Sequence, residues 1–224
     1  MTQVSDERLA LVTGTSSGLG GAVARGLLAH GWAVVGMSRR RSAIEDPRYR
    51  HIEIDLGDLE HLRDVACSDL AAVVTDARWS RVGLVNNAGD VGALRPFEEL
   101  DPLNVARVFA VNAIAPMFLM GFVVRAALPA ARLRIVNVST GAATLSIPGI
   151  ADYGSSKAAL RLAGMNLATE LASDERPGGV RSNVAILSYA PGTVDTPMQE
   201  LARAPGRPWN RLFVDFHAQG TLAT

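Results

Sequence analysis

Cysteine and histidine are scarce in this sequence of 224 residues, and the scarcity argues against two kinds of site. The one cysteine, Cys67, cannot form an internal disulfide or build a metal site alone, which fits a reducing compartment. The four histidines, at positions 30, 51, 61 and 217, show no metal-ligand spacing. We therefore expect no bound metal and a cytoplasmic location.

An excess of charge of either sign is also missing. Lysine and arginine together number 22, as do aspartate and glutamate, so the formal net charge is +0 at pH 7. The charge gives no reason to expect nucleic acid or another strongly charged partner. The first eight residues are polar and carry acids, which is unlike a signal peptide.

Hydrophobic runs long enough for a membrane span are missing as well. The most apolar run, Val108–Val124, contains Asn112 and Pro116 and falls short of the ~20 residues that a span needs. A buried helix explains this run better. Because its apolar residues occupy more than one face, a helix packed against a partner subunit is also possible. We expect no membrane partner, and a homodimer or homotetramer.

The sequence does contain short apolar runs that alternate with helix-like segments. The expected strands are 9–12, 33–38, 50–55, 82–85, 133–139 and 180–189. The expected helices are 18–30, 59–74 after the N-cap Asp58, one from Pro102 after the N-cap Asp101, and 152–173. This alternation predicts an α/β fold, a single Rossmann-type doubly wound parallel sheet with helices on both faces, as one domain over 1–224. In such a sheet, ligands bind at the carboxyl ends of the strands.

A glycine-rich turn, Thr13–Gly20, separates the first expected strand from the first helix. Its glycines, spaced G-x-x-x-G-x-G, let backbone approach a pyrophosphate at the helix N-terminus. A tight turn without a ligand is the alternative. The turn also matches G-x-S-x-G, with Ser16 as the nucleophile of a hydrolase and Asp195 and His217 as its partners. That interpretation is disfavoured, because such a nucleophile normally follows a central strand rather than the first one.

The second expected strand ends in Ser38-Arg39-Arg40-Arg41, about 20 residues after the turn, where NAD-binding proteins usually carry an acid. No acid occurs before Glu45. Arginine binds a 2′-phosphate that a carboxylate would repel. The segment therefore favours NADP over NAD, and a basic surface loop is the alternative.

Tyr153 and Lys157 lie four residues apart in an expected helix and so share one face. A free tyrosine has a pKa near 10, and a nearby ammonium group lowers that pKa, which makes the phenol a usable acid or base. By itself the pair also fits an ordinary turn of a surface helix. It becomes informative only together with the other motifs.

These motifs occur together in the order seen in short-chain dehydrogenases/reductases, which this sequence resembles over nearly its whole length. The matching motifs are Thr13-Gly14-x-x-x-Gly18-x-Gly20, Asn86-Asn87-Ala88-Gly89, Asn112, Ser139-Thr140, Tyr153-x-x-x-Lys157 and Pro191-Gly192. The segment from Tyr189 to Arg203 is most similar to the sepiapterin reductase and benzil reductase branch. The resemblance implies an NADP(H)-dependent enzyme that reduces a carbonyl group by hydride transfer.

The resemblance also implies a role for each matched residue. Tyr153 would protonate the carbonyl oxygen, Lys157 would hold the nicotinamide ribose and lower the pKa of Tyr153, and Asn112 would anchor a water that resupplies the proton. The cofactor-binding residues would be Gly14, Ser16, Ser17, Gly18, Leu19 and Gly20 at the phosphates, Ser38 and Arg39 at the 2′-phosphate, Asp55 and Leu56 at the adenine, Asn87, Ala88 and Gly89 at the ribose, and Pro191, Gly192, Val194 and Thr196 at the nicotinamide.

The sequence departs from the family pattern in two places. The substrate-orienting hydroxyl, usually a serine thirteen residues before the tyrosine, falls on Thr140, whereas Ser139 would point to the opposite face of the strand. We therefore assign the role to Thr140. The chain also stops at Thr224, where the family usually continues with another helix and a last strand, so we expect this domain to lack them.

The substrate pocket should be bordered by residues 141–152 and 194–217. Their apolar side chains suit an apolar or aromatic ketone or diketone; they are Leu145, Ile147, Ile150, Met198, Leu201, Trp209 and Phe213. The sequence thus predicts an NADPH-dependent carbonyl reductase. The alternative is a sensor or scaffold of the same fold that binds the cofactor without turnover, although such a protein has no need of an acid poised by a lysine.

Overall fold

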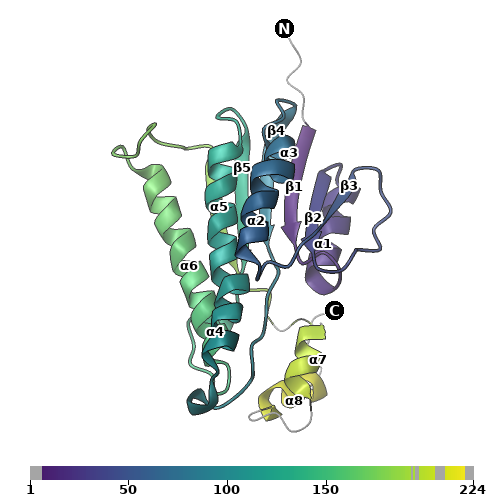
Figure 1. The fold of residues 1–224 in the computed structure, drawn as a ribbon, viewed down its shortest axis with the longest axis vertical. Coiled ribbons are helices and arrows are strands. Elements are labelled where there is room, and N and C mark those ends of the chain that lie inside the picture. The colour runs from purple at the N-terminus through teal and green to yellow at the C-terminus, as the bar shows by residue number, and fades with distance from the viewer. Residues whose placement is uncertain (1–6, 193, 195–196, 205–209, 220–224) are drawn as a thin grey trace.

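The computed structural model describes residues 7–192, 194, 197–204 and 210–219. Within these residues, six strands form one parallel sheet in the order β3-β2-β1-β4-β5-β6 (Figure 1). The strands are β1 Glu7–Thr13, β2 Ala33–Ser38, β3 Tyr49–Glu53, β4 Trp79–Asn86, β5 Arg132–Val138 and β6 Val184–Tyr189. The strand order reverses between β1 and β4. The predicted doubly wound α/β class is confirmed, and the reversal places a crevice beyond the ends of these two strands.

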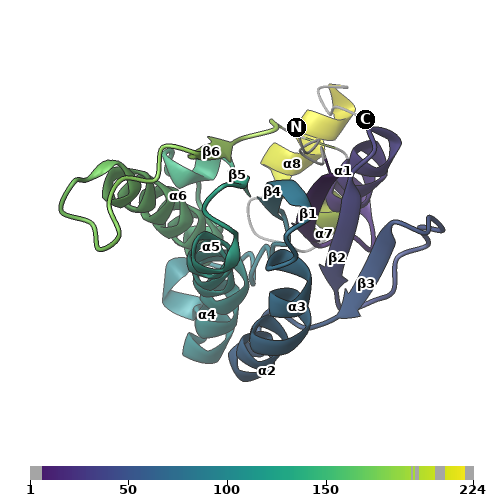
Figure 2. The same ribbon diagram turned by 90° about the horizontal axis from the view of Figure 1, so that it is seen from above.

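Helices cover both faces of this sheet (Figure 2). The α-helices are α1 Gly18–Ala29, α2 Leu59–Val65, α3 Ala71–Val74, α4 Pro102–Phe109, α5 Ala115–Ala126, α6 Ala151–Ala172, α7 Pro197–Arg203 and α8 Arg211–Ala218. Single turns of other helix types are η1 Ala66–Leu70, η2 Phe97–Glu99, η3 Ala110–Ile114 and η4 Gly141–Ala143. Figure 2 shows α1 on one face and α2, α3, α5 and α6 on the other.

Strand β1 shows why the centre of the sheet is buried on both sides. Alternate residues of a strand point to opposite faces. Leu9 and Leu11 belong to the large core cluster beneath α2, α3, α5 and α6, while Ala10 and Val12 belong to a smaller cluster beneath α1. A continuous apolar run is what such a strand needs.

The local signals for helix starts are confirmed. Asp58 accepts a hydrogen bond from the His61 backbone N–H at 3.0 Å at the start of α2. Asp101 accepts from the N–H groups of Leu103 and Asn104 at 2.8 and 3.0 Å at the start of α4. These bonds satisfy donors that the first turn of a helix leaves without partners.

Two features of the elements differ from the sequence prediction. The helix expected over 59–74 contains the π-helical turn η1, and the helix that opens at Pro102 contains the π-helical turn η3. The strand expected from residue 180 begins only at Val184. Residues 180–183 instead close the connection from α6, where the Arg181 N–H donates to the Leu171 carbonyl at 2.9 Å.

The helix running from Pro102 to Ala126 is long and apolar enough to cross a membrane by length and composition. However, 67% of its most apolar window is buried inside the fold. Leu119 and Val123 on α5 are fully buried in the large core cluster. The expectation of a buried helix over 108–124 is therefore confirmed.

Candidate active site

The glycine turn after β1 is too tight for side chains at two of its positions. A Cβ on Gly14 would lie 2.8 Å from Asn87 Nδ2, and one on Gly20 would lie 2.3 Å from the Gly14 carbonyl oxygen. Gly14 also has a φ of +76°, which favours glycine. Asn87 Nδ2 donates to the Thr13 carbonyl at 2.9 Å, so the turn is tied directly to the end of β4.

The N-terminus of α1 is open to an anion. Its N-cap, Ser17, forms no capping hydrogen bond through its side chain, and no acid stands in the first turn. The first N–H groups of a helix and its dipole then attract a negative group. Ser17 and Gly18 are exposed, and Ser16 and Leu19 are half-buried.

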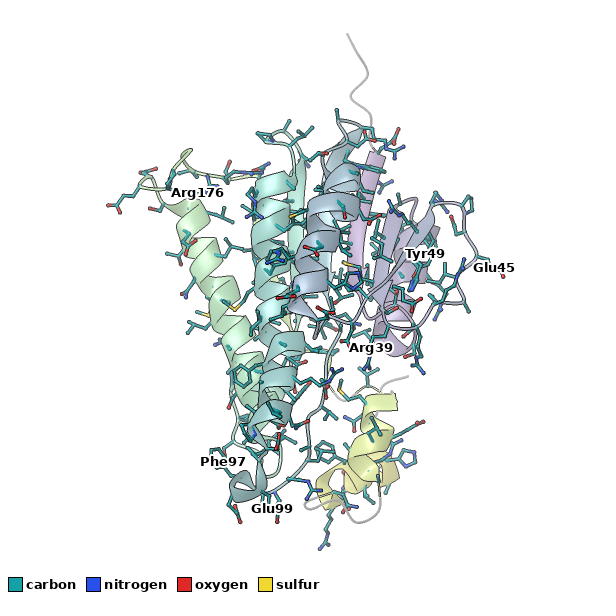
Figure 3. The ribbon with its side chains drawn as sticks, viewed as in Figure 1. Arg39, Glu45, Tyr49, Phe97, Glu99 and Arg176 are labelled. Atoms are coloured by element: carbon teal, nitrogen blue, oxygen red, sulfur yellow. The ribbon has the colours of Figure 1, made fainter. Side chains whose placement is uncertain are left out.

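Beyond β2, the side chains expected to select the ribose lie at the same edge of the sheet. Ser38 is buried, and its hydroxyl donates to the Arg40 carbonyl at 2.9 Å. Arg39 is exposed, and Figure 3 shows it at the edge that faces α7 and α8. No acid from the sequence segment 38–44 competes for this place.

Asp55, which follows β3, is ionised and already bound to protein groups. It accepts from the Gly57 N–H at 2.9 Å and from Arg107 Nη2 at 3.3 Å. Partial burial acts to raise its pKa, but the Gly57 hydrogen bond and the charges of Arg107 and Arg39 prevail and lower it. Leu56 is buried in the large core cluster, so only its backbone can border a ligand.

Tyr153 and Lys157 lie on one face of α6, as their spacing predicted. Lys157 is 3% exposed, its Nζ donates to the Val138 carbonyl at 3.0 Å, and it lies 6.0 Å from the centroid of the Tyr153 ring. Burial lowers the pKa of Lys157 to about 8. Burial also raises the pKa of the Tyr153 phenol, and a hydrogen bond with Thr140 offsets only part of that. The expected lowering of the Tyr153 pKa is therefore not seen, because removal from water outweighs the opposing effect of the Thr140 hydroxyl.

The structure chooses between the two neighbouring hydroxyls after β5. The Thr140 hydroxyl lies close enough to the Tyr153 phenol to act on its pKa, and it accepts a hydrogen bond from the Ala142 N–H at 3.3 Å. Ser139 continues the sheet, where its backbone N–H donates to the Tyr189 carbonyl at 2.7 Å. Thr140 is thus the hydroxyl that lies beside the phenol, and its role toward a substrate stays a prediction.

Asn112 lies in the π-helical turn η3, and its side chain is fully engaged with protein groups. Its Oδ1 accepts from the Asp90 N–H at 2.8 Å, and its Nδ2 donates to the Asp90 carbonyl at 2.8 Å and to Ser156 Oγ at 3.0 Å. Ser156 in turn donates to the Tyr153 carbonyl at 2.7 Å. The sequence interpretation missed Ser156. Its position three residues after Tyr153 on the same helix could have indicated it.

Gly89 marks the point where the segments of the site converge. A Cβ at this position would lie 3.4 Å from Met198 Cε, 3.5 Å from Asn112 Oδ1 and 3.7 Å from Lys157 Nζ. Ala88 is joined to β1, since its N–H donates to Thr13 Oγ1 at 2.9 Å. The end of β4, α7 and α6 therefore meet here.

Other residues expected to hold the nicotinamide follow β6. Pro191 and Val194 are half-buried, and Gly192 has a φ of +78° with open space around its missing Cβ. Thr196 lies outside the described residues, as does Trp209 of the expected pocket.

An apolar cluster packs around the Tyr153 ring. It consists of Leu94, Ala142, Ile150 and Ala202, with Val91, Ile147, Tyr153 and Phe213 packed against it. Ile147, Ile150 and Phe213 were expected at the pocket, whereas Leu145 and Leu201 are largely exposed. The sequence interpretation missed Val91 and Leu94, because the segment between β4 and α4 carries no regular pattern.

The hydrolase alternative and a metal site find no geometric support in the part of the chain that the structure describes. Over the described ranges, no group of three or more His, Cys, Asp or Glu side chains could hold a metal ion. There too, Ser16 has no histidine as a hydrogen-bond partner, and His217 is exposed on α8. Asp195, the remaining member of the hydrolase hypothesis, lies outside the described residues.

Comparison with known proteins gives consistent matches. A family profile described as short chain dehydrogenase matches residues 8–205. A benzil reductase of Bacillus subtilis that forms (S)-benzoin is 31% identical over 210 residues, which cover 93% of this chain and 81% of the relative. A short-chain dehydrogenase/reductase structure from Burkholderia vietnamiensis superposes with a TM-score of 0.73 at 33% identity, covering 83% of this chain and 84% of that one. A protein of Beutenbergia cavernae crystallised with bound NADP superposes with a TM-score of 0.72 at 30% identity, covering 88% of this chain and 77% of that one.

Proposed function

Because this chain belongs to the short-chain dehydrogenase family, we propose that it is an NADP(H)-dependent reductase that converts a ketone or diketone carbonyl to an alcohol, with Tyr153 as the general acid. One observation carries the proposal. The Tyr153 ring borders an apolar cluster, its centroid lies 6.0 Å from the buried Lys157 Nζ, and the Thr140 hydroxyl acts on its phenol. A proton donor, a cation and an apolar wall thus meet at one edge of the sheet.

The residues present fit a dinucleotide cofactor. The turn at Gly14 and Gly20 brings bare backbone to the open N-terminus of α1, where a pyrophosphate would bind. When bound, the cofactor supplies the hydride. The residues proposed to hold it are Gly14, Ser16, Ser17, Gly18, Leu19, Gly20, Ser38, Arg39, Asp55, Leu56, Asn87, Ala88, Gly89, Tyr153, Lys157, Pro191, Gly192, Val194 and Thr196.

The preference for NADP(H) is supported by the exposed Arg39 at the end of β2 and by the lack of an acid beside it. A guanidinium group donates paired, charge-assisted hydrogen bonds to a phosphate. The Beutenbergia cavernae relative that was crystallised with NADP shows that a protein with this fold accepts the phosphorylated cofactor.

Tyr153 holds its proton at neutral pH, because burial keeps the pKa of the phenol above its ordinary value. It can therefore donate that proton to a carbonyl oxygen placed between itself and Thr140. Lys157, with a pKa of about 8, remains mainly protonated at neutral pH and offers its ammonium to a ribose. Because the Asn112 amide is already bound to Asp90 and Ser156, Asn112 acts as a positioning residue rather than as a side-chain ligand of a proton-supplying water.

An apolar, aromatic diketone is the substrate class that we favour. The side chains around the phenol ring are apolar, and the Bacillus subtilis relative is a benzil reductase. A homodimer or homotetramer is part of the proposal, since exposed apolar side chains line neighbouring helices: Ile114, Met117, Leu162 and Met165. Light scattering, which measures the mass of the assembly in solution, tests this oligomeric state. A cytoplasmic location is proposed from the free cysteine, Cys67.

The proposal is tested by following the loss of NADPH absorbance with benzil. We expect turnover by the unmodified protein and a fall in kcat of at least about 100-fold in Tyr153→Phe, with a much smaller loss of NADPH affinity, because the phenol is one of many residues proposed to hold the cofactor. Calorimetry measures that affinity. Tight NADPH binding without turnover on a panel of ketones and diketones would instead support the sensor or scaffold.

A further inference from the structure

Asp152, the residue before Tyr153, is a buried acid to which the proposed chemistry gives no task. It is 2% exposed, and within the described ranges it forms no ion pair with a basic side chain. It stands in the first turn of α6, where the helix N-terminus stabilises a negative charge. A buried carboxylate loses its hydration, so the protein groups that bind it must compensate.

All the hydrogen bonds that Asp152 forms come from N–H donors. Its Oδ1 accepts from the Tyr153 N–H at 2.8 Å, and its Oδ2 accepts from the Ala93 N–H at 3.2 Å and from Asn104 Nδ2 at 3.5 Å. Both oxygens must therefore be acceptors. The two oxygens of a carboxylate meet this requirement, whereas the amide of asparagine accepts only through its oxygen, because its other end is an NH2 donor. One side chain thus joins the start of α6, the loop after β4 and α4.

The loop after β4 lies directly on this carboxylate. A Cβ on Gly92 would lie 2.2 Å from Asp152 Oδ2, and Gly92 has a φ of +77°. Two residues later, Leu94 has a φ of 52°, and no other non-glycine residue in the described ranges has a positive φ. A leucine adopts this conformation at a cost, and keeps it only where surrounding contacts hold it.

Leu94 packs in the apolar cluster that we take as one wall of the proposed substrate pocket. It is 3% exposed and belongs to the apolar cluster against which Tyr153 packs. The Asp152 carboxylate accepts hydrogen bonds from the backbone N–H of Ala93, one residue before Leu94, and from the backbone N–H of Tyr153. The Asp152 carboxylate therefore links the position of Leu94 to that of the Tyr153 phenol.

We propose that Asp152 is a positioning residue that sets the shape of the substrate pocket by holding Leu94 against Tyr153. This inference rests on the proposed reductase function. Binding of a bulky aromatic diketone, which fills the pocket, should depend on the position of Leu94. Binding of a small aliphatic diketone should not. Most of the residues proposed to hold the cofactor lie on the glycine turn and after β2, β3 and β6, and among the residues that the structure describes Asp152 forms no hydrogen bond to any of these.

The test compares Asp152→Asn with the matched control Asp58→Asn, an exposed acid at the start of α2 that also accepts a backbone N–H. In Asp152→Asn, we expect the KM for benzil to rise at least about tenfold and the KM for 2,3-butanedione less than about threefold. The affinity for NADPH, measured by calorimetry, should change less than about twofold. Asp58→Asn should leave all three values unchanged.

A double-mutant cycle with Leu94→Ala shows whether Asp152 acts through the wall. Leu94→Ala should itself raise the KM for benzil. Adding Asp152→Asn to that variant should raise it further by less than about twofold, because the two residues share one effect. Independent, fully additive effects would contradict the inference.

Two further measurements cover the case in which Asp152→Asn folds poorly or the unmodified protein reduces no carbonyl. Asn104→Ala removes one donor to the same carboxylate from a half-exposed position, and should shift the benzil KM in the same direction. Hydrogen exchange of residues 88–95 requires no turnover and should be faster in Asp152→Asn than in Asp58→Asn. An unchanged benzil KM in both the Asp152 and Asn104 variants, equal changes for both diketones, or unchanged exchange overturns the inference. Absence of turnover in the unmodified protein overturns only the proposed function.

Discussion

Lys157 should make the protein less stable at neutral pH than it would be without this charge. It is the only lysine in the sequence, and burial lowers its pKa from 10.5 to about 8. One pKa unit corresponds to about 1.4 kcal/mol, so the buried ammonium costs about 3 kcal/mol of folding free energy while both states hold the proton.

The direction of the pH dependence follows from the order of the two pKa values. Below about pH 8, the folded and unfolded chains both carry the charge, and the full cost is present. Between about pH 8 and 10.5, the folded state loses its proton first, so the unfolded state binds more protons and the free energy of unfolding rises. Above 10.5 the cost is gone.

Lys157→Met keeps the apolar stem and removes the charge. It also leaves the Val138 carbonyl without its 3.0 Å partner, which costs about 1 kcal/mol. We therefore expect the variant to be more stable than the unmodified protein by about 2 kcal/mol at pH 7, with the difference shrinking as the pH rises from 8 to 10.5. The same variant should be nearly inactive.

Urea unfolding followed by circular dichroism, at several pH values from 7 to about 10, measures this difference. The pair Tyr153→Phe and Tyr153→Phe/Lys157→Met is the control, because it removes any effect of the missing ammonium on the neighbouring phenol. A Lys157→Met variant that is less stable at pH 7, or a stability difference that does not change with pH, would refute the reasoning.

Two further substitutions test the assignment of individual residues. Arg39→Asp should raise the KM for NADPH by about 10- to 100-fold and leave the KM for NADH nearly unchanged, because one charge-assisted phosphate contact is lost. Arg40→Asp is the matched control. Equal effects of Arg39→Asp on both cofactors would refute the role of Arg39. Thr140→Ala should lower kcat/KM by about 100-fold because the hydroxyl next to the Tyr153 phenol is removed, whereas Ser139→Ala should change it less than about threefold; steady-state kinetics with benzil measures both, and the reverse order would assign the role to Ser139.

Sequence patterns were sufficient wherever the controlling interaction is local or periodic. The apolar runs predicted the parallel strands, and Asp58 and Asp101 marked the starts of two helices. The four-residue spacing placed Tyr153 and Lys157 on one face of α6. Each of these depends on neighbours a few residues away, whose geometry the backbone of a helix or strand imposes.

The tertiary structure decided what depends on burial and on contacts between distant segments. The sign of the Tyr153 pKa shift follows from desolvation, which only the packed fold reveals. The hydrogen bond from the Arg181 N–H to the Leu171 carbonyl holds residues 180–183 out of β6. The hydrogen bond from the Ala93 N–H to the Asp152 carboxylate joins two segments that no sequence spacing relates. A local pattern records which side chains share a face, but only the path of the folded chain determines which groups lose their water and which donors they meet instead.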